Sequence, residues 1–324
     1  MDIIAHTNRG KFYIDNKNEN TSKTTLVADW PFFRGEIQVY KKLKFEDLKK
    51  GFSWSLKQNF IEEDSSVIST MIAQGKKDGL TLEESILQSD YLPKFLAFNR
   101  RTDYEKSGET SSYTKPFKKH FKSLSYQERR VYPIIDNLHD LETLFDVGAT
   151  LIQLRIKNKS QRDIYHEVEK AVRVAQKYSN SRLIINDYWD AAIKFGAFGV
   201  HLGQGDLKTA DLYKIEESGV RLGLSTHSFW EVSYALQFSP SYIACGPIYK
   251  TRVKEMPWLP QGERNLSYWV NMLPSPVVAI GGINFQNLDS VKKTGVKIIS
   301  LINGIVGSAR PQNAFLLYQK RWEE

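Results

Sequence analysis

The chain has 324 residues, of which 41% are hydrophobic and 25% charged, with a formal net charge of +8 and one cysteine, Cys245. This composition is that of a globular protein and excludes collagen-like, coiled-coil and wholly disordered chains. A single cysteine excludes an internal disulfide and a cysteine-rich zinc site, and no run reaches the ~20 apolar residues of a membrane-spanning helix.

The excess positive charge is spread along the chain, and its densest run, residues 115–122, is short. We therefore expect no nucleic-acid partner and interpret the basic surface as one that attracts phosphorylated metabolites. The first nine residues lack the apolar segment of a secretory signal. These features predict a cytoplasmic protein without a membrane partner.

Residues 1–100 are predicted to form an α+β extension, and residues 101–125, which are rich in Ser, Thr and Lys, are predicted to be a linker. The features of the extension, in order, are a polar stretch over residues 1–25, an aromatic stretch around Trp30, an amphipathic helix through Ser65–Lys77 that ends at Gly79, and a second helix that begins at Leu82.

Residues 126–324 alternate short β-branched runs with helical stretches such as Arg162–Lys177 and Asn284–Thr294. Eight regular units favour a closed (β/α)₈ TIM barrel over an open doubly wound sheet. The predicted strands are Val131–Ile135, Leu151–Leu154, Leu183–Ile185, Gly199–Leu202, Arg221–Leu224, Tyr242–Ala244, Val277–Ile280 and Ile298–Leu301.

Polar residues and glycines follow nearly every predicted strand, at the end where TIM barrels carry their chemistry. Each group also has an ordinary structural explanation when taken alone. Asn186 and Asp187 would suit a helix N-cap, and a Gly281–Gly282 pair would suit a tight turn. Their order along the chain is what favours a functional interpretation.

These strand-end segments, in this order, resemble the motifs of the thiamine phosphate synthase family, and the resemblance covers residues 130–315. It implies a TIM barrel that joins hydroxymethylpyrimidine pyrophosphate to thiazole phosphate, giving thiamine phosphate and pyrophosphate, with Mg²⁺. The matching segments are Gln153–Lys157, Ile185–Ala192, Gly199–Asp206, Gly223–His227, Gly246–Lys254 and Pro276–Ile283.

The resemblance also implies roles that fit the chemistry of the residues. Cationic side chains and a hydroxyl suit a departing pyrophosphate, carboxylates suit Mg²⁺, and glycines allow backbone N–H groups to approach a phosphate. The implied catalytic residues are Arg155, Lys157, Ser225 and Lys254, the metal ligands are Asp187 and Asp206, and the substrate-binding residues are Gln153, Asn186, His201, Thr251, Gly281, Gly282, Asn303 and Gly304.

Four positions depart from the family pattern: Ile156 replaces an acidic residue, Gly205 a glutamate, Val253 a threonine and Asn303 a serine. Loss of one neutral hydrogen bond typically costs ~1 kcal/mol, which would weaken thiazole binding without abolishing the chemistry. These departures leave an alternative open, a catalytically impaired synthase-like protein that binds thiamine phosphates or regulates their synthesis. A homo-oligomer is also left open.

Residues 25–100 faintly resemble the C-terminal part of a hydroxymethylpyrimidine phosphate kinase, aligned on Gly79–Glu84. The anion hole of such kinases would fall on Glu63–Ser66, where the glycines are absent and two carboxylates would repel phosphate. The resemblance implies a degenerate remnant without kinase activity, and so argues against a bifunctional kinase–synthase. An unrelated accessory segment is the alternative.

Overall fold

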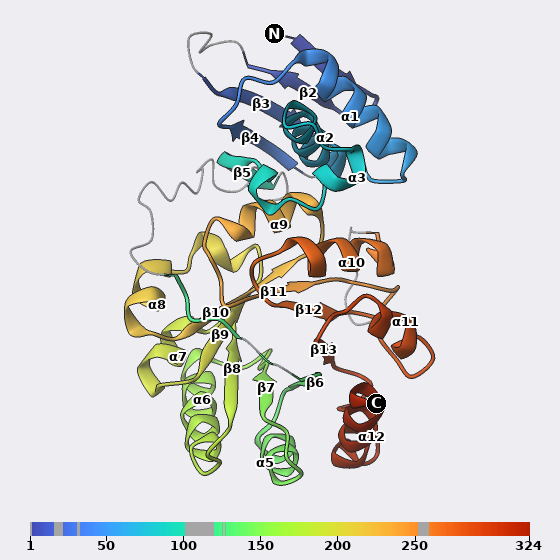
Figure 1. Ribbon diagram of the computed structural model, residues 1–324. Coiled ribbons are helices and arrows are strands. Elements are labelled where there is room, and N and C mark those ends of the chain that lie inside the picture. The colour runs from blue at the N-terminus through green and yellow to red at the C-terminus, as the bar shows by residue number, and fades with distance from the viewer. Residues whose placement is uncertain are drawn as a thin grey trace. The chain divides into compact units, whose positions relative to one another are not determined.

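The computed structural model describes residues 2–15, 22–30, 33–100, 120–124, 126, 128–251 and 259–324. The chain divides into two compact units (Figure 1). The first comprises Met1–Pro116 together with Ser228–Gln237, and the second comprises Phe117–His227 and Phe238–Glu324. We call them the N-terminal unit and the barrel unit. The predicted boundaries at residues 100 and 125 stay predictions.

The barrel unit contains eight parallel strands that close on themselves in the order β10-β11-β12-β13-β6-β7-β8-β9, which confirms the predicted TIM barrel. All eight strands start and end within two residues of the predicted runs, because Val, Ile and Leu favour strands that are buried on both faces. They are β6 Arg130–Ile135, β7 Leu151–Leu154, β8 Arg182–Asn186, β9 Gly199–Leu202, β10 Arg221–Thr226, β11 Tyr242–Cys245, β12 Val277–Ile280 and β13 Ile298–Leu301.

Helices follow most barrel strands and surround them (Figure 1). In the part of the chain that the structure describes, no helix combines the length and the apolar character needed to cross a membrane. The helices of the barrel unit are α5 Leu138–Asp146, α6 Gln161–Ala175, α7 Trp189–Phe195, α8 Leu212–Ser218, α10 Gly262–Met272, α11 Leu288–Lys293 and α12 Pro311–Glu323, with a short 3₁₀ helix η3 at Asp206–Lys208.

The interior of the barrel is filled by side chains from successive strands. Its cluster of buried residues includes Leu124, which precedes the first barrel strand and donates its N–H to the carbonyl of Ser241 at 2.9 Å. Leu124 belongs to the predicted linker by position, but its side chain is fully buried in the barrel core. The other members are Tyr132, Leu151, Ile184, Tyr242, Ala244, Val278 and Ile298.

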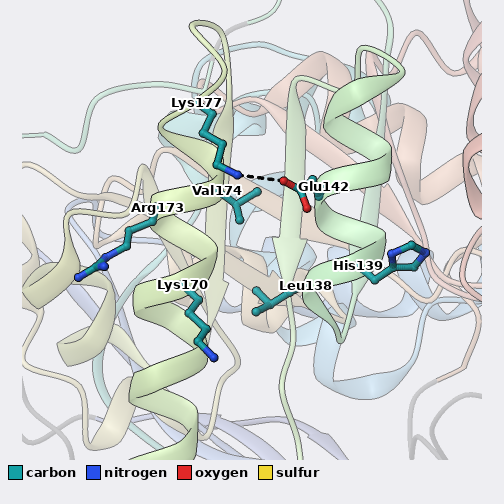
Figure 2. Close-up of a pocket in the computed structure, with 7 residues that line it drawn as sticks. All are labelled: Leu138, His139, Glu142, Lys170, Arg173, Val174 and Lys177. Atoms are coloured by element: carbon teal, nitrogen blue, oxygen red, sulfur yellow. Dashed lines mark hydrogen bonds and ion pairs between the residues drawn. The ribbon is translucent and has the colours of Figure 1, made fainter.

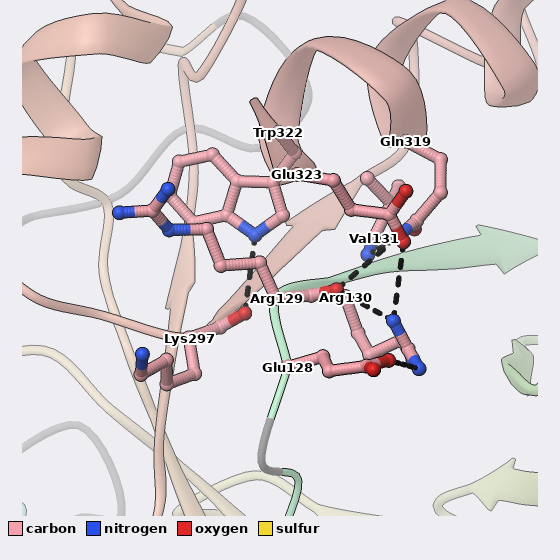
Figure 3. A network of polar contacts seen from close by, with 8 residues as sticks. All are labelled: Glu128, Arg129, Arg130, Val131, Lys297, Gln319, Trp322 and Glu323. Atoms are coloured by element: carbon pink, nitrogen blue, oxygen red, sulfur yellow. Dashed lines mark hydrogen bonds and ion pairs between the residues drawn. The ribbon is translucent and has the colours of Figure 1, made fainter.

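Helix α12 joins the first and last barrel strands at their N-terminal ends (Figure 3). Gln319 accepts a hydrogen bond from the Val131 N–H at 2.8 Å and donates one to the carbonyl of Arg129 at 3.1 Å. The buried indole of Trp322 donates to the carbonyl of Lys297, just before β13, at 3.1 Å. The C-terminal helix therefore closes the barrel at the seam between its two ends.

The N-terminal unit is built on an antiparallel sheet in the order β1-β2-β3-β4-β5, which confirms an α+β extension. Its first two strands lie within residues 1–25, where the sequence indicated only a polar stretch and no strand was predicted. One further helix of this unit, α9, comes from the segment between β10 and β11. The elements are β1 Asp2–His6, β2 Lys11–Ile14, β3 Thr24–Asp29, β4 Phe33–Val39, α1 Phe45–Lys57, α2 Glu62–Lys77, α3 Leu82–Ser85, η2 Ser89–Tyr91, β5 Lys94–Arg100 and α9 Phe229–Leu236.

Helix α2 covers the predicted amphipathic helix, and its residues from Glu63 to Gly75 are buried on every side. The small hydroxyl residues Ser66, Ser69 and Thr70 tolerate burial because they bond back to the preceding turn. The buried Ser65 hydroxyl has no hydrogen-bond partner among the described residues. Ser66 donates to the carbonyl of Glu62 at 3.0 Å, and Thr70 donates to that of Val67 at 2.7 Å. Gly79, with a φ of 82°, ends the helix as predicted.

We expect Trp322→Ala to lower the free energy of unfolding by about 3–5 kcal/mol, because it removes a fully buried aromatic side chain at the barrel seam. Urea-induced unfolding of the full chain, followed by circular dichroism, measures this change. Leu317→Ala is the control, since Leu317 lies on the same helix and is 59% exposed; its effect should stay within about 0.5 kcal/mol. Equal effects of the two substitutions would contradict the role of α12.

Candidate active site

Asp187 lies directly after β8, at the carboxyl end of the barrel. Its backbone has a φ of 65°, in the left-handed region that non-glycine residues rarely adopt. The Asp187 N–H donates to the carbonyl of His201 at 2.9 Å, and the Lys157 ammonium forms an ion pair with the Asp187 carboxylate. Strain of this kind concentrates at functional sites, where the surrounding structure holds it in place.

Asp206 stands at the start of η3, close to Asp187. Its carboxylate accepts a hydrogen bond from the Gly203 N–H at 2.9 Å. Burial raises the pKa of Asp206, and the negative charge of Asp187 raises it further. Two carboxyl groups that face each other in a partly buried place favour a bound cation, because a cation removes their mutual repulsion.

This pair fits Mg²⁺ better than a softer metal. Mg²⁺ prefers carboxylate oxygens and takes its remaining ligands from substrate phosphates and water, so it needs no closed protein cage. No group of three or more His, Cys, Asp and Glu side chains with metal-binding geometry occurs among the described residues. The two carboxylates themselves suit a hard cation that is bound together with a phosphorylated substrate.

A chain of hydrogen bonds runs through the barrel interior and links three predicted site residues. Gln153 donates to the Tyr132 hydroxyl at 3.0 Å, and that hydroxyl lies 3.0 Å from the hydroxyl of Tyr242. His201 lies between Tyr242 and Ser225, with Nδ1 2.9 Å from the Tyr242 hydroxyl and Nε2 2.7 Å from the Ser225 hydroxyl. We call these five residues the interior chain.

The interior chain has a preferred direction of hydrogen bonding. Burial lowers the pKa of His201 to about 4, so its imidazole is neutral near pH 7 and has one donor and one acceptor. Because Tyr132 already accepts from Gln153, its buried O–H is satisfied by donating to Tyr242. Tyr242 then donates to Nδ1 of His201, and Nε2–H donates to Ser225. The Ser225 O–H is left free to donate to a ligand.

The two tyrosines of the interior chain were not among the predicted site residues. Each tyrosine lies within an apolar run. The only feature of the sequence that could identify it as a site residue is its phenol hydroxyl, which needs a hydrogen-bond partner when buried. A glycine on the neighbouring strand makes room for Tyr242, since a Cβ on Gly223 would lie 2.1 Å from its ring. Gly223, Tyr242 and His201 are adjacent in the register of β9, β10 and β11.

Arg155 and Lys157 follow β7 on the same rim. The Arg155 N–H donates to the carbonyl of Ile135 at 2.7 Å, which fixes its backbone. Its guanidinium makes no hydrogen bond or ion pair with the described residues, so it is available to a ligand. Ile156, between them, is buried at 2% exposure; an acidic residue at this position would need a partner in the core.

Gly281 and Gly282, after β12, have φ values of 95° and 70°, which favour glycine. They also lie close to the segment after β11. A Cβ on Gly281 would be 2.7 Å from Cα of Pro247, and one on Gly282 would be 2.7 Å from the carbonyl oxygen of Tyr249. The backbone conformation and the close packing therefore explain why both residues are glycine. Their backbone groups lie near the rim.

The remaining predicted residues either form no hydrogen bond or ion pair with Asp187 and Asp206 within the described part of the chain or lie outside it. Asn303 and Gly304 follow β13, and Asn303 is exposed. Thr251 is the last described residue before a gap, and Lys254 and Val253 lie outside the described residues. Asn186 pairs with His201 in the register of β8 and β9, which places it beside the interior chain. A Cβ on Gly205 would meet nothing within 4 Å, so space does not require glycine there.

A surface pocket on the barrel unit contains none of the predicted site residues (Figure 2). It lies between α5 and α6, and an ion pair of 3.0 Å joins Lys177 to Glu142 across it. Its position on the outer helices separates it from the strand ends. The residues that line it are Leu138, His139, Glu142, Lys170, Arg173, Val174 and Lys177.

Comparisons with known proteins concern the barrel. Residues 131–305 match a family model described as thiamine monophosphate synthase. A thiamine-phosphate synthase of Yersinia pseudotuberculosis is 43% identical over 189 residues, 58% of this chain and 87% of that protein. One of Proteus mirabilis is 44% identical over 187 residues, 57% and 86% of the two chains. A solved thiamine phosphate pyrophosphorylase from Pyrococcus furiosus superposes with a TM-score of 0.53 at 26% identity, covering 60% of this chain and 97% of that one.

The direction of the interior chain predicts the tautomer of His201. We expect ¹⁵N NMR of the imidazole to show a neutral ring protonated at Nε2 from about pH 5 to about pH 8, because its pKa is lowered to about 4. Tyr242→Phe should remove this tautomer preference, whereas Tyr178→Phe, which deletes a hydroxyl bonded to Asp146 on the surface, should leave it unchanged. A ring protonated at Nδ1 in the wild type would contradict the assigned direction.

Proposed function

We infer the reaction and the roles of single residues from one premise: the chain belongs to the thiamine monophosphate synthase family. It is a transferase that joins hydroxymethylpyrimidine pyrophosphate to thiazole phosphate. The bond between the pyrimidine methylene carbon and the pyrophosphate oxygen breaks, and the oxygen keeps the electron pair. A bond then forms between that carbon and the thiazole nitrogen, which gives thiamine phosphate and pyrophosphate.

The observation that carries this proposal is the grouping of Asp187, Asp206 and Lys157, with Asp187 close to His201 of the interior chain. The leaving pyrophosphate gathers negative charge as the carbon–oxygen bond breaks. Fixed cations and hydrogen-bond donors aimed at that charge lower the barrier, since they need no reorganisation during the reaction.

Asp187 and Asp206 are the residues that would hold Mg²⁺, which when bound supplies positive charge at the pyrophosphate oxygens. Lys157 lies against Asp187 and is positioned to contact both the carboxylate and a phosphate. The planar guanidinium of Arg155 suits two phosphate oxygens at once. Lys254 is a further proposed cation for the same leaving group.

Ser225 is proposed to donate its O–H to the pyrophosphate. The neutral His201 ring holds Ser225 in this orientation by donating from Nε2, and the two buried tyrosines hold the ring. Gln153 and Asn186 are proposed to bind the pyrimidine, and Thr251, Gly281, Gly282, Asn303 and Gly304 the thiazole phosphate. Small phosphorylated molecules are thus the proposed partners, and a cytoplasmic location stays a prediction.

The purified full chain, given both substrates and Mg²⁺, should form thiamine phosphate and pyrophosphate in equal amounts. A chelator should stop the reaction, because the carboxylate pair then lacks its cation, and added Mg²⁺ should restore it. Liquid chromatography of the products measures both. Absence of product, together with tight calorimetric binding of thiamine phosphate, would overturn the proposal in favour of a binding or regulatory protein.

Asp187→Asn should lower kcat by at least about 100-fold, as expected for loss of a preorganised charge contact. Asp211→Asn is the matched control: Asp211 caps α8 through the Lys214 N–H at 3.1 Å, and asparagine caps equally well. Steady-state kinetics with saturating Mg²⁺ compares the two variants. A turnover near the wild-type rate in Asp187→Asn would refute its assigned role.

A further inference from the structure

Helix α9 follows β10 in the sequence but belongs to the N-terminal unit. β10 ends at Thr226, and α9 begins at Phe229 after only two residues, His227 and Ser228. The chain therefore passes from the strand that carries Ser225 into a helix held by another unit. It returns to the barrel unit at Phe238.

The first turn of α9 is capped by two side chains, one local and one distant. The Ser228 hydroxyl accepts from the Glu231 N–H at 3.2 Å. The Trp230 N–H donates to the carboxyl of Asp64, on α2, at 3.2 Å, and the Phe229 N–H is a second donor to that carboxyl. Free N–H groups at a helix start need such acceptors, so Asp64 completes the N-terminus of α9.

Further contacts hold α9 along its length. Seven of its eight residues are buried. The Ser233 hydroxyl donates to the carbonyl of Pro93 at 2.9 Å. The ring of Phe95 meets Trp230 edge-on, with ring centres 4.7 Å apart, and Phe60 meets Phe229 at 5.6 Å. The residues that make these contacts with α9 all lie between residues 60 and 95, outside the segment that matches the family model.

The Asp64 carboxyl is suited to accept hydrogen bonds in its uncharged form. Burial raises its pKa to about 8, and the nearby carboxylates of Glu63 and Glu231 raise it as well, against the opposing effect of the two amides. Burial thus favours the uncharged form of this carboxyl. Asparagine has the same shape and keeps one carbonyl acceptor, whereas leucine keeps the approximate size and removes the acceptor.

We propose that Asp64 is a positioning residue for the transferase reaction: by capping α9, it fixes the two-residue connection to β10 and so holds Ser225 where it binds pyrophosphate. The N-terminal unit thereby controls pyrophosphate affinity through the continuous chain. The inference rests on the proposed function in one respect, the binding of pyrophosphate beside Ser225.

Calorimetry with inorganic pyrophosphate and Mg²⁺ tests this in the full chain. Asp64→Leu should weaken pyrophosphate binding about tenfold, in the usual range for coupling between sites, while Asp64→Asn should stay within about twofold of the wild type. In steady-state kinetics, KM for the pyrimidine pyrophosphate should rise in Asp64→Leu more than KM for thiazole phosphate. Asp47→Leu is the control, because Asp47 pairs with Lys76 in the same unit and takes no part in capping α9.

Hydrogen exchange on the wild-type chain keeps the test decisive if Asp64→Leu fails to fold. Coupling is reciprocal, so saturating pyrophosphate should slow exchange of the Phe229 and Trp230 amides. Unchanged exchange in a chain that binds pyrophosphate, or a folded Asp64→Leu variant with wild-type affinity, would overturn this inference and leave the proposed reaction standing. A chain that does not bind pyrophosphate at all would overturn both.

Discussion

Closure of eight parallel strands into a barrel is the constraint on which the site depends, because it brings all eight carboxyl ends to one rim. Lys157, Asp187 and Asp206 come from three different strand ends, yet their charged groups interact directly. No single segment could hold two facing carboxylates and a cation in this way. Helix α12 contributes by binding both strands at the seam, far along the chain from the charged residues it helps to align.

The barrel interior is both a core and an extension of the site. Tyr132 and Tyr242 fill space among aliphatic side chains, and their hydroxyls connect Gln153 to His201. A buried polar chain is stable only if every member has a partner, so each residue limits the orientation of the next. The result is a serine hydroxyl aimed at the rim by groups that lie below it. Packing and chemistry are therefore achieved by the same residues.

The sequence predicts the barrel well because buried parallel strands are nearly continuous Val, Ile and Leu runs, and the rim residues follow those runs directly. It does not reveal the interior tyrosines, since a pattern of apolar residues does not tell which hydroxyls meet across strands. The Ser and Thr residues of α2 suggest contact with solvent, but the hydroxyls of Ser66, Ser69 and Thr70 are satisfied within the helix. The packing of α9 also cannot be predicted from local sequence patterns, because its partners Asp64 and Phe95 are more than 130 residues away along the chain.

We propose that pyrophosphate binds at the rim between the carboxylate pair and Ser225. The most direct measurement is a crystal structure of the full chain with Mg²⁺ and inorganic pyrophosphate. We expect a cation bound by Asp187 and Asp206, with pyrophosphate oxygens within hydrogen-bond distance of the Ser225 hydroxyl and the Arg155 guanidinium. Pyrophosphate bound elsewhere, or a cation that contacts neither carboxylate, would contradict it.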